Sequence, residues 1–199
     1  LKLRPNATGT YSQWTGSVNT TNWAHVNEKY ANGDTDYVYT HVNAARDTYN
    51  IEDHNATTDT WNITIVKVIA CAELFVDDKI TLQAVIGGTV YDGQTYTLTT
   101  SYAEYTSDWV TNPNTGLAWT WADIDALQAG FKSVQVGADM TAERVTQLYV
   151  KVNYTLQVSG PVQILTLRPD GSGTYSQWTG SGNSTNWQHV NEVIKNGDT

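Results

Sequence analysis

Six asparagines stand at the spacing that accepts N-linked glycans, with a serine or threonine two positions later. Asn19 recurs as Asn183 in the second half of the chain although the neighbouring residues differ, which favours a retained function for this acceptor. The alternative is that these are ordinary turn asparagines of a threonine-rich chain. We expect at least two of them to carry sugar, which would add solubility and protease resistance. The acceptors are Asn6, Asn19, Asn55, Asn62, Asn153 and Asn183.

The loop at residues 32–36 groups hard oxygen ligands of the kind that calcium prefers. Its acidic residues are Asp34 and Asp36, and Glu28 precedes them. The spacing matches no EF-hand, and the sequence NGDT is equally typical of a plain turn. Asp34 and Asp36 are therefore a weak calcium candidate, and no other metal or cofactor is predicted.

Catalytic arrangements are hard to build from this sequence. The histidines show no HExxH spacing, and no serine lies in a G-x-S-x-G turn. We expect His25, beside Trp23, to pack and hydrogen-bond in a loop. The sequence does not exclude the paired carboxylates of a glycoside hydrolase, because the fold sets the distance between them. The single Cys71 lies in an apolar run, which indicates a buried, unreactive thiol. The sequence predicts that the protein is not an enzyme.

Charge and hydropathy exclude two classes of partner. The 20 acidic and 11 basic residues give a net charge of −9, which opposes binding to a nucleic-acid phosphate backbone. The most apolar stretch, residues 62–75, is interrupted by Lys67 and Glu73. We therefore expect no insertion into a membrane.

An internal repeat is the strongest signal in the sequence. Residues 1–35 match residues 165–199 at a fixed offset of 164, with 25 identities in 35 positions and no gap. Trp14, Trp23 and His25 recur as Trp178, Trp187 and His189. One explanation is a tandem array of modules, and the other is a duplicated domain whose two copies share one fold. The array is favoured, because residues 36–164 contain no second match.

The repeat defines the expected domains. Residues 1–158 form one module, residues 159–161 a short hinge, and residues 162–199 the start of a second copy. So short a segment cannot bury its own tryptophans. We expect it to be completed by chain beyond Thr199 or by another subunit, and the junction residues are Leu165, Leu167, Arg168, Trp178 and Trp187.

Alternating polar and apolar residues predict strands, whereas helical periodicity is almost absent. Expected strands cover residues 1–4, 36–42, 47–51, 62–73, 79–91, 94–105, 131–136 and 147–158. Gly87-Gly88 is expected to form a bulge or bend, and Asp92-Gly93 a hairpin turn. One short helix should begin at Thr120 and end at Gly130, and residues 22–28 should form a single turn. These elements predict an all-β antiparallel sandwich of jelly-roll or immunoglobulin-like topology.

The tryptophans admit two interpretations. They could line a sugar-binding platform, but in a sandwich of this size most of them should belong to the core. The six concerned are Trp14, Trp23, Trp61, Trp109, Trp119 and Trp121.

The motifs TYSQWT, GDTDYVYT, GGTVYDG, VTNPNTGLAWTWADIDALQAG and RVTQLYVKVNYT stand in this order along residues 1–158. In this combination the chain resembles the tandem β-sandwich modules of large prokaryotic surface, fibre and phage-associated proteins. The resemblance implies a structural repeat of an extracellular appendage, and it transfers no catalytic residue.

Two functions follow as expectations. The first is a structural subunit of a glycosylated extracellular fibril or pilus-like filament, in which copies of the module join head to tail through strand pairing. The alternative is a carbohydrate-binding or adhesin module on a cell or virion surface, whose partners are surface glycans. The first predicts that Trp14 and Trp23 are buried or at a junction, and the second predicts an exposed aromatic cluster on one face.

Overall fold

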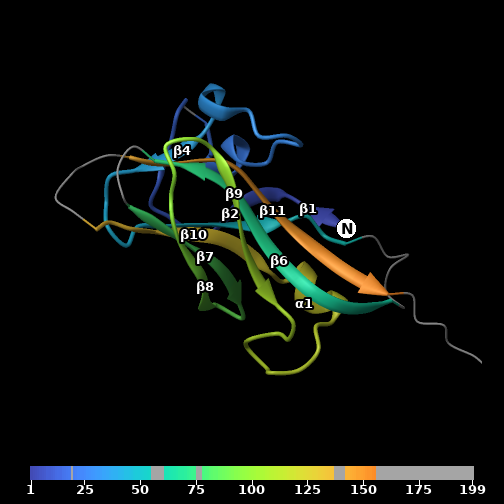
Figure 1. Cartoon of the computed structure of the whole chain (residues 1–199). Coiled ribbons are helices and arrows are strands. Elements are labelled where there is room, and N and C mark those ends of the chain that lie inside the picture. Colours follow the sequence, from blue (N-terminus) through green and yellow to red (C-terminus); the bar gives the residue numbers. More distant parts are fainter. Residues whose placement is uncertain (19, 55–60, 75–77, 137–141, 156–199) are drawn as a thin grey trace, which may run out of the picture. The chain divides into compact units, whose positions relative to one another are not determined.

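The computed structural model describes residues 1–18, 20–54, 61–74, 78–136 and 142–155, all within one compact unit that spans Leu1–Gln157. These residues form two antiparallel β-sheets (Figure 1). None of the helices in this part of the chain is long and apolar enough to cross a membrane. The prediction of an all-β antiparallel sandwich with one short α-helix is confirmed.

The first sheet has the strand order β3-β4-β11-β6-β9, and β1 also pairs with β11. Its centre is the long pair β6 and β11, which stay in register over most of their length. The strands are β1 (Lys2–Leu3), β3 (Thr15–Gly16), β4 (Val38–Thr40), β6 (Asn62–Glu73), β9 (Ala103–Trp109) and β11 (Glu143–Thr155).

The second sheet has the order β2-β5-β10-β7-β8. Short 3-10 helices and α1 lie in the connections. The strands are β2 (Pro5–Ser12), β5 (Arg46–Ile51), β7 (Lys79–Ile86), β8 (Thr89–Thr97) and β10 (Gln128–Val134), and the helices are η1 (Asn22–His25), η2 (Gly33–Thr35) and α1 (Trp121–Asp125).

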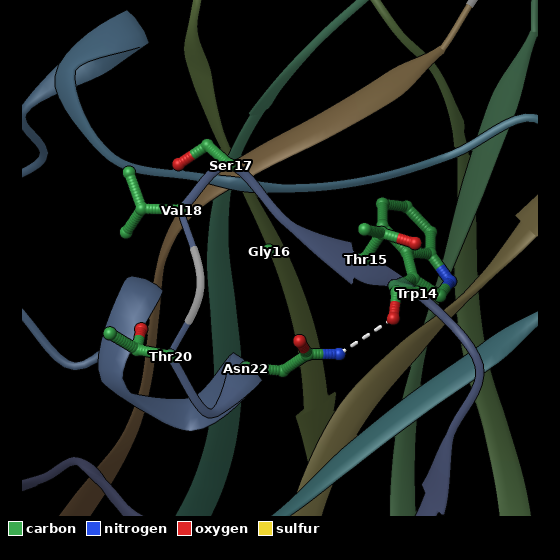
Figure 2. Close-up of a pocket in the computed structure, with 7 residues that line it drawn as sticks. All are labelled: Trp14, Thr15, Gly16, Ser17, Val18, Thr20 and Asn22. Atoms are coloured by element: carbon green, nitrogen blue, oxygen red, sulfur yellow. Dashed lines mark hydrogen bonds between the residues drawn. The ribbon is translucent and has the colours of Figure 1, made fainter.

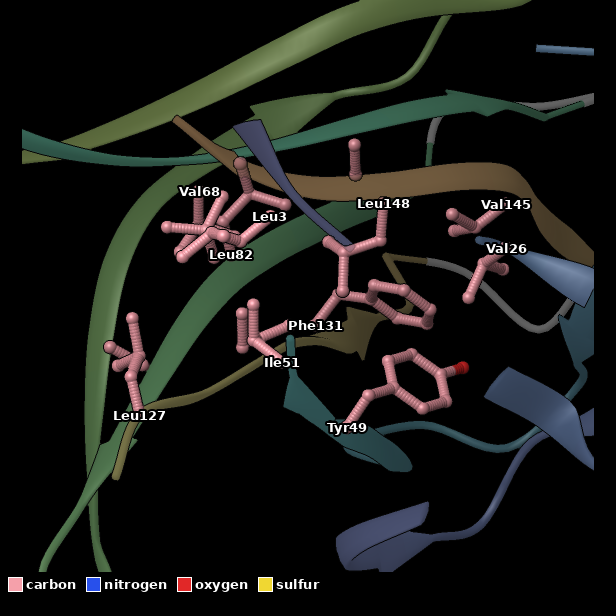
Figure 3. Packing of buried hydrophobic residues seen from close by; sticks show 14 of the residues in the cluster. Leu3, Val26, Tyr49, Ile51, Val68, Leu82, Leu127, Phe131, Val145 and Leu148 are labelled. Atoms are coloured by element: carbon pink, nitrogen blue, oxygen red, sulfur yellow. The ribbon is translucent and has the colours of Figure 1, made fainter. Parts of the chain in front are cut away.

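Apolar side chains from both sheets meet in one core (Figure 3). Phe131 of β10 is fully buried and packs edge-on against Trp14 at 4.7 Å and against Tyr49 at 6.0 Å between ring centroids. Leu148 of β11 reaches the same core from the first sheet. Because burial of such side chains is the main favourable term in folding, this core fixes how the elements at its edge are placed.

The hairpin turn lies at a different place from the predicted one. Gly87 and Gly88 connect β7 to β8 with φ angles of 58° and 81°, a region that glycine enters without steric cost. Asp92-Gly93, predicted as the turn, lies inside β8, where Asp92 pairs with Gln83. The prediction of a turn at Asp92-Gly93 was wrong. Gly87-Gly88 and Asp92-Gly93 are both turn-forming dipeptides, and Gly87-Gly88, whose residues both lie in the left-handed region, forms the turn.

The helix is shorter than predicted. Thr120 caps α1 as expected, since its side chain accepts from the backbone of Asp123 while the Asp123 side chain accepts from the backbone of Thr120. However, α1 ends at Asp125, and Gly130 lies in β10. A Cβ at Gly130 would lie 2.0 Å from the carbonyl oxygen of Asp47, so this glycine permits close strand approach and does not end the helix.

Two other strands differ from the prediction. A strand at Pro5–Ser12 was missed, because its residues are small and polar. The strand predicted at residues 147–158 begins earlier, at Glu143. The alternation of polar and apolar residues in this strand does not produce one exposed face, since residues 146–150 are all buried. The strand at Asn62–Glu73 is confirmed, and the turn predicted at residues 22–28 is observed as a 3-10 helix over Asn22–His25.

Candidate functional site

The loop between β3 and η1 forms a cavity of about 440 Å³ at the edge of the sandwich (Figure 2). Trp14 anchors one side, because its indole Nε1 donates to the carbonyl of Ala45 at 3.1 Å. Asn22 closes the other side, since its amide donates to the carbonyl of Trp14 at 2.8 Å and to the Asp47 carboxylate at 2.7 Å. The lining is Trp14, Thr15, Gly16, Ser17, Val18, Thr20 and Asn22.

A hydrogen-bonded array of side chains lies against this cavity. His25 of η1 is fully buried, its Nδ1 bonds the Asp36 carboxylate, and its Nε2 lies 2.8 Å from the Thr20 hydroxyl. Ser17 donates to Asp36 at 3.3 Å. A Cβ at Gly16 would lie 2.2 Å from Nε2 of His25, so only glycine leaves room for the ring. The prediction that His25 packs and hydrogen-bonds in a loop is confirmed.

Two carboxyl groups beside the array, half-buried Glu28 and fully buried Asp47, have raised pKa values. The pKa of Glu28 is raised to about 7, mainly by burial and to a smaller extent by the nearby Asp36 carboxylate. Burial also raises the pKa of Asp47 to about 7, against the lowering effect of hydrogen bonds from Tyr49 and Asn22. The protonation of both groups therefore changes within the physiological range.

A second surface lies along β4 and the residues that flank it. We call it the tyrosine face and define it as Tyr39 of β4, Tyr37 before the strand and His41 after it. Val38 and Thr40 between them are buried, so the three rings point to the opposite side of the strand. Ring centroids are 6.0 Å apart between Tyr37 and Tyr39 and 5.8 Å apart between Tyr39 and His41. They line a cavity of about 220 Å³ whose remaining lining is Ser17, Ala142 and Arg144.

Charged groups border the tyrosine face. The Arg144 guanidinium lies 4.8 Å from the ring centre of Tyr37 and bonds the Asp34 carboxylate at 2.7 Å. Glu73 approaches the same guanidinium at 3.6 Å, and the Tyr102 hydroxyl donates to Asp34 at 3.1 Å. Ser17 lines both this cavity and the larger one, so the two lie on either side of one residue.

Among the residues that the structure describes, the six tryptophans do not form an exposed sugar-binding platform. Trp14, Trp119 and Trp121 are buried at 5%, 5% and 7% exposure. Trp119 and Trp121 each donate the indole N–H to a backbone carbonyl, of Trp109 and Trp61 respectively. Trp23, Trp61 and Trp109 pack against the core. The core interpretation is therefore confirmed, because three of the six rings are buried and the other three are partly buried against the core.

The predicted glycan acceptors are distributed over the surface. Asn6 on β2 and Asn62 on β6 are exposed, and Asn153 on β11 is half-buried. Asn19, Asn55 and Asn183 lie outside the described residues, as do the junction residues Leu165, Leu167, Arg168, Trp178 and Trp187. Occupancy by sugar stays a prediction.

The weak calcium candidate has its carboxylates engaged elsewhere. Asp34 binds Arg144 and Tyr102, and Asp36 binds His25 and Ser17. Within the described ranges, no three histidine, cysteine, aspartate or glutamate side chains are grouped so that they could hold a metal ion. Cys71 is buried, and burial raises the pKa of its thiol to about 11, which keeps it in the unreactive form.

Sequence reasoning missed the tyrosine face, although a signal was present. In the segment YVYTH, rings alternate with Val38 and Thr40, the period of a strand with one aromatic face. Reasoning also missed the approach of Thr20 and Asp36 to opposite nitrogens of His25. The spacing of these residues does not predict the contact, because only the fold brings the loop after β3 next to Asp36, which precedes β4.

No protein-family model matches the sequence, and no curated protein matches it. Among solved structures, it is similar to a family 4 carbohydrate-binding module with 18% identity over 60% of this chain and 76% of the other, at a TM-score of 0.34. It is similar to the module TmCBM61, solved with β-1,4-galactotriose, with 12% sequence identity over 72% of this chain and 90% of the other, at a TM-score of 0.36. It is also similar to the family 30 carbohydrate-binding module of the cellulosomal cellulase Cel9D-Cel44B of Clostridium thermocellum. That match has 11% sequence identity over 75% of this chain and 90% of the other, at a TM-score of 0.33. These similarities are too low to transfer a site or a ligand.

Proposed function

We propose that residues 1–155 form a glycan-binding module displayed outside the cell, and that sugars bind at the tyrosine face. The observation that carries the proposal is the alternation of three rings on one side of β4 above a cavity of about 220 Å³. A partly exposed aromatic cluster of this kind supports the binding hypothesis, which expects aromatic rings on one face of the module.

The chemistry of the face suits a sugar. Aromatic rings offer flat apolar surfaces for the C–H side of a pyranose, and tyrosine adds a hydroxyl at the wet edge. Tyr37 and Tyr39 are half-buried, so their positions are fixed before a ligand arrives, which lowers the entropy cost of binding. A spacing near 6 Å between successive ring centroids lets more than one ring contact the same ligand.

Polar groups at the border would orient the ligand. Sugar hydroxyls both donate and accept, so they match the Arg144 guanidinium, the Asp34 carboxylate and the Ser17 hydroxyl. The Arg144–Asp34 ion pair holds both groups at 2.7 Å beside Tyr37. A few charged groups around an apolar floor are the usual composition of a small-molecule site.

The test is binding of the purified chain to a panel of soluble oligosaccharides, followed by titration calorimetry with the best ligand. Tyr39→Ala should weaken binding by at least about fivefold, since a stacked ring contributes roughly 1 kcal/mol or more. The matched control is Tyr30→Ala, because Tyr30 is 74% exposed and lies outside the face. Binding that Tyr39→Ala leaves unchanged, or an absence of binding across the panel, would contradict the proposal.

The internal repeat supports a second proposal, that such modules occur in tandem. In the first copy, the repeated segment is built into the sandwich: β1 pairs with β11, β2 pairs with β5, and Trp14 packs on Phe131. We expect residues 165–199 to occupy the same places in a further module. A fibril of linked modules is one assembly that this organisation would permit.

The array can be tested by adding a second copy of residues 36–158 after Thr199. The enlarged chain should unfold with about twice the enthalpy of the first module, since unfolding enthalpy scales with the number of folded residues. In addition, Trp178 and Trp187 should become protected from oxidation. An unchanged enthalpy with both tryptophans reactive would show that the second copy does not form the same fold.

A further inference from the structure

Three side chains at the larger cavity have the connectivity of an activated nucleophile. A hydroxyl (Thr20), an imidazole (His25) and a carboxylate (Asp36) are joined in series through the two nitrogens of the ring. The hydroxyl lies 2.8 Å from Nε2, within the range for proton transfer. Nucleophilic catalysis by alcohols needs this order of nucleophile, base and orienting group.

The hydrogen bonds determine which nitrogen carries the proton. The Asp36 carboxylate can only accept, so Nδ1 of His25 donates to it. A neutral imidazole then has its lone pair on Nε2, and the Thr20 hydroxyl donates to that lone pair. Asp36 also accepts from Ser17 at 3.3 Å, which holds the carboxylate in position. The base therefore faces the hydroxyl oxygen with the lone pair that must receive the proton.

The surroundings separate the base from solvent and leave the hydroxyl accessible. His25 is fully buried, and Gly16 fits against its ring because a Cβ there would overlap Nε2. Thr20 is exposed and lines the cavity of about 440 Å³, as Figure 2 shows. Val18, 54% exposed on the same rim, supplies an apolar surface for the acyl part of a ligand. The second copy of the repeat has Ser184 and His189 at the positions of Thr20 and His25, so a hydroxyl and an imidazole recur there.

We propose that Thr20 is a nucleophile that accepts an acyl group from small carboxylic esters. The Thr20 oxygen attacks the ester carbonyl while its proton passes to Nε2 of His25, and the alcohol leaves with that proton. Water then attacks the new threonyl ester by the same route in reverse, which releases the carboxylic acid and restores the hydroxyl. Asp36 is a positioning residue, because it acts through the ring. The activity is independent of the tyrosine face.

The test uses p-nitrophenyl acetate with the full chain produced in a host without N-glycosylation. After brief reaction, the peptide that contains Thr20 should gain the mass of one acetyl group, and hydroxylamine should remove it. Hydroxylamine cleaves esters and leaves the amides formed on lysines. Thr20→Val keeps the shape without the hydroxyl and should lose this adduct, whereas Thr20→Ser should keep it. His25→Gln should slow acetylation about 100-fold, the usual contribution of a general base.

The adjacent Thr21 provides the matched control, since it is exposed and its side chain makes no capping hydrogen bond. Thr21→Val should acetylate at Thr20 as the parent chain does, and circular dichroism should show that all variants fold. An ester adduct that persists in Thr20→Val, or a parent chain that forms no hydroxylamine-sensitive adduct on this peptide, would overturn the proposal. An equal rate in His25→Gln would also overturn it, because the hydroxyl would then not depend on the base.

Discussion

Replacement of Glu143 by glutamine should change how the stability of the protein depends on pH. Glu143 opens β11 opposite Thr40 and is fully buried, and neither carboxylate oxygen has a hydrogen-bond partner among the residues described. Its pKa is raised from 4.5 to about 7, mainly by burial and to a smaller extent by the carboxylate of Asp78. The folded protein therefore binds this proton more tightly than the unfolded chain does.

The sign and size follow from proton linkage. The stabilising contribution of the bound proton is complete below pH 4.5 and is lost as the pH rises to about 7. Because each pKa unit corresponds to about 1.4 kcal/mol, the loss is about 3 kcal/mol. The glutamine in Glu143→Gln cannot ionise. Between roughly pH 5 and pH 8 the free energy of unfolding should therefore decrease less in this variant than in the parent, and the difference should be about 3 kcal/mol.

Urea denaturation at both pH values, with a chelator present so that no cation supplies the missing charge, measures this difference. Glu28 and Asp47 titrate in both proteins and cancel in the comparison. Asp53→Asn is the control, since Asp53 is exposed and should leave the pH dependence unchanged. Parallel pH curves for the parent and Glu143→Gln would refute the reasoning, because they would mean that the buried carboxyl does not change its charge.

Three further substitutions test the packing. Trp14→Ala should lower the free energy of unfolding by about 3–5 kcal/mol in urea titration, because it removes a buried ring that packs on the core; a loss below about 1 kcal/mol would contradict that placement. Gly16→Ala should cost about 1–3 kcal/mol, since the new Cβ would overlap the ring of His25, and adding His25→Ala should recover part of the loss. Thr120→Ala should cost about 1 kcal/mol by removing the cap of α1, measured by thermal melting, while an unchanged melting temperature would show that the bond to Asp123 contributes nothing.

Much of the sandwich could be predicted because apolar runs and alternation report burial directly. The strand at residues 62–73 matches the observed β6 at both ends, since a mostly apolar run lies between the polar residues Asn62 and Glu73. The strand at Pro5–Ser12 escaped notice because it lies at the edge of its sheet, where pairing and not side-chain burial defines it. Local pattern is therefore informative at the centre of a sheet and poor at its edge.

The candidate site was less predictable, for two physical reasons. Aromatic residues show the same sequence pattern whether they face the core or the solvent, so only the observed register separates buried Trp14 from half-buried Tyr39. The meeting of Thr20, His25 and Asp36 depends on how the loop after β3 folds against β4. Contacts of that kind are set by tertiary packing, which the order of residues does not display.

The pairing of β1 with β11 has a consequence for how the module responds to tension. Leu1 bonds Val152 at 3.0 Å and β1 runs antiparallel to β11, so the chain enters the module beside the place where β11 approaches its end at Thr155 (Figure 1). A pull applied at Leu1 and Thr155 would open the ladder from that end, one hydrogen bond after another, and would not shear several bonds together. The first strand would therefore peel away at low force, and a thread of such units would lengthen under load with Leu3 as the first core residue to be exposed.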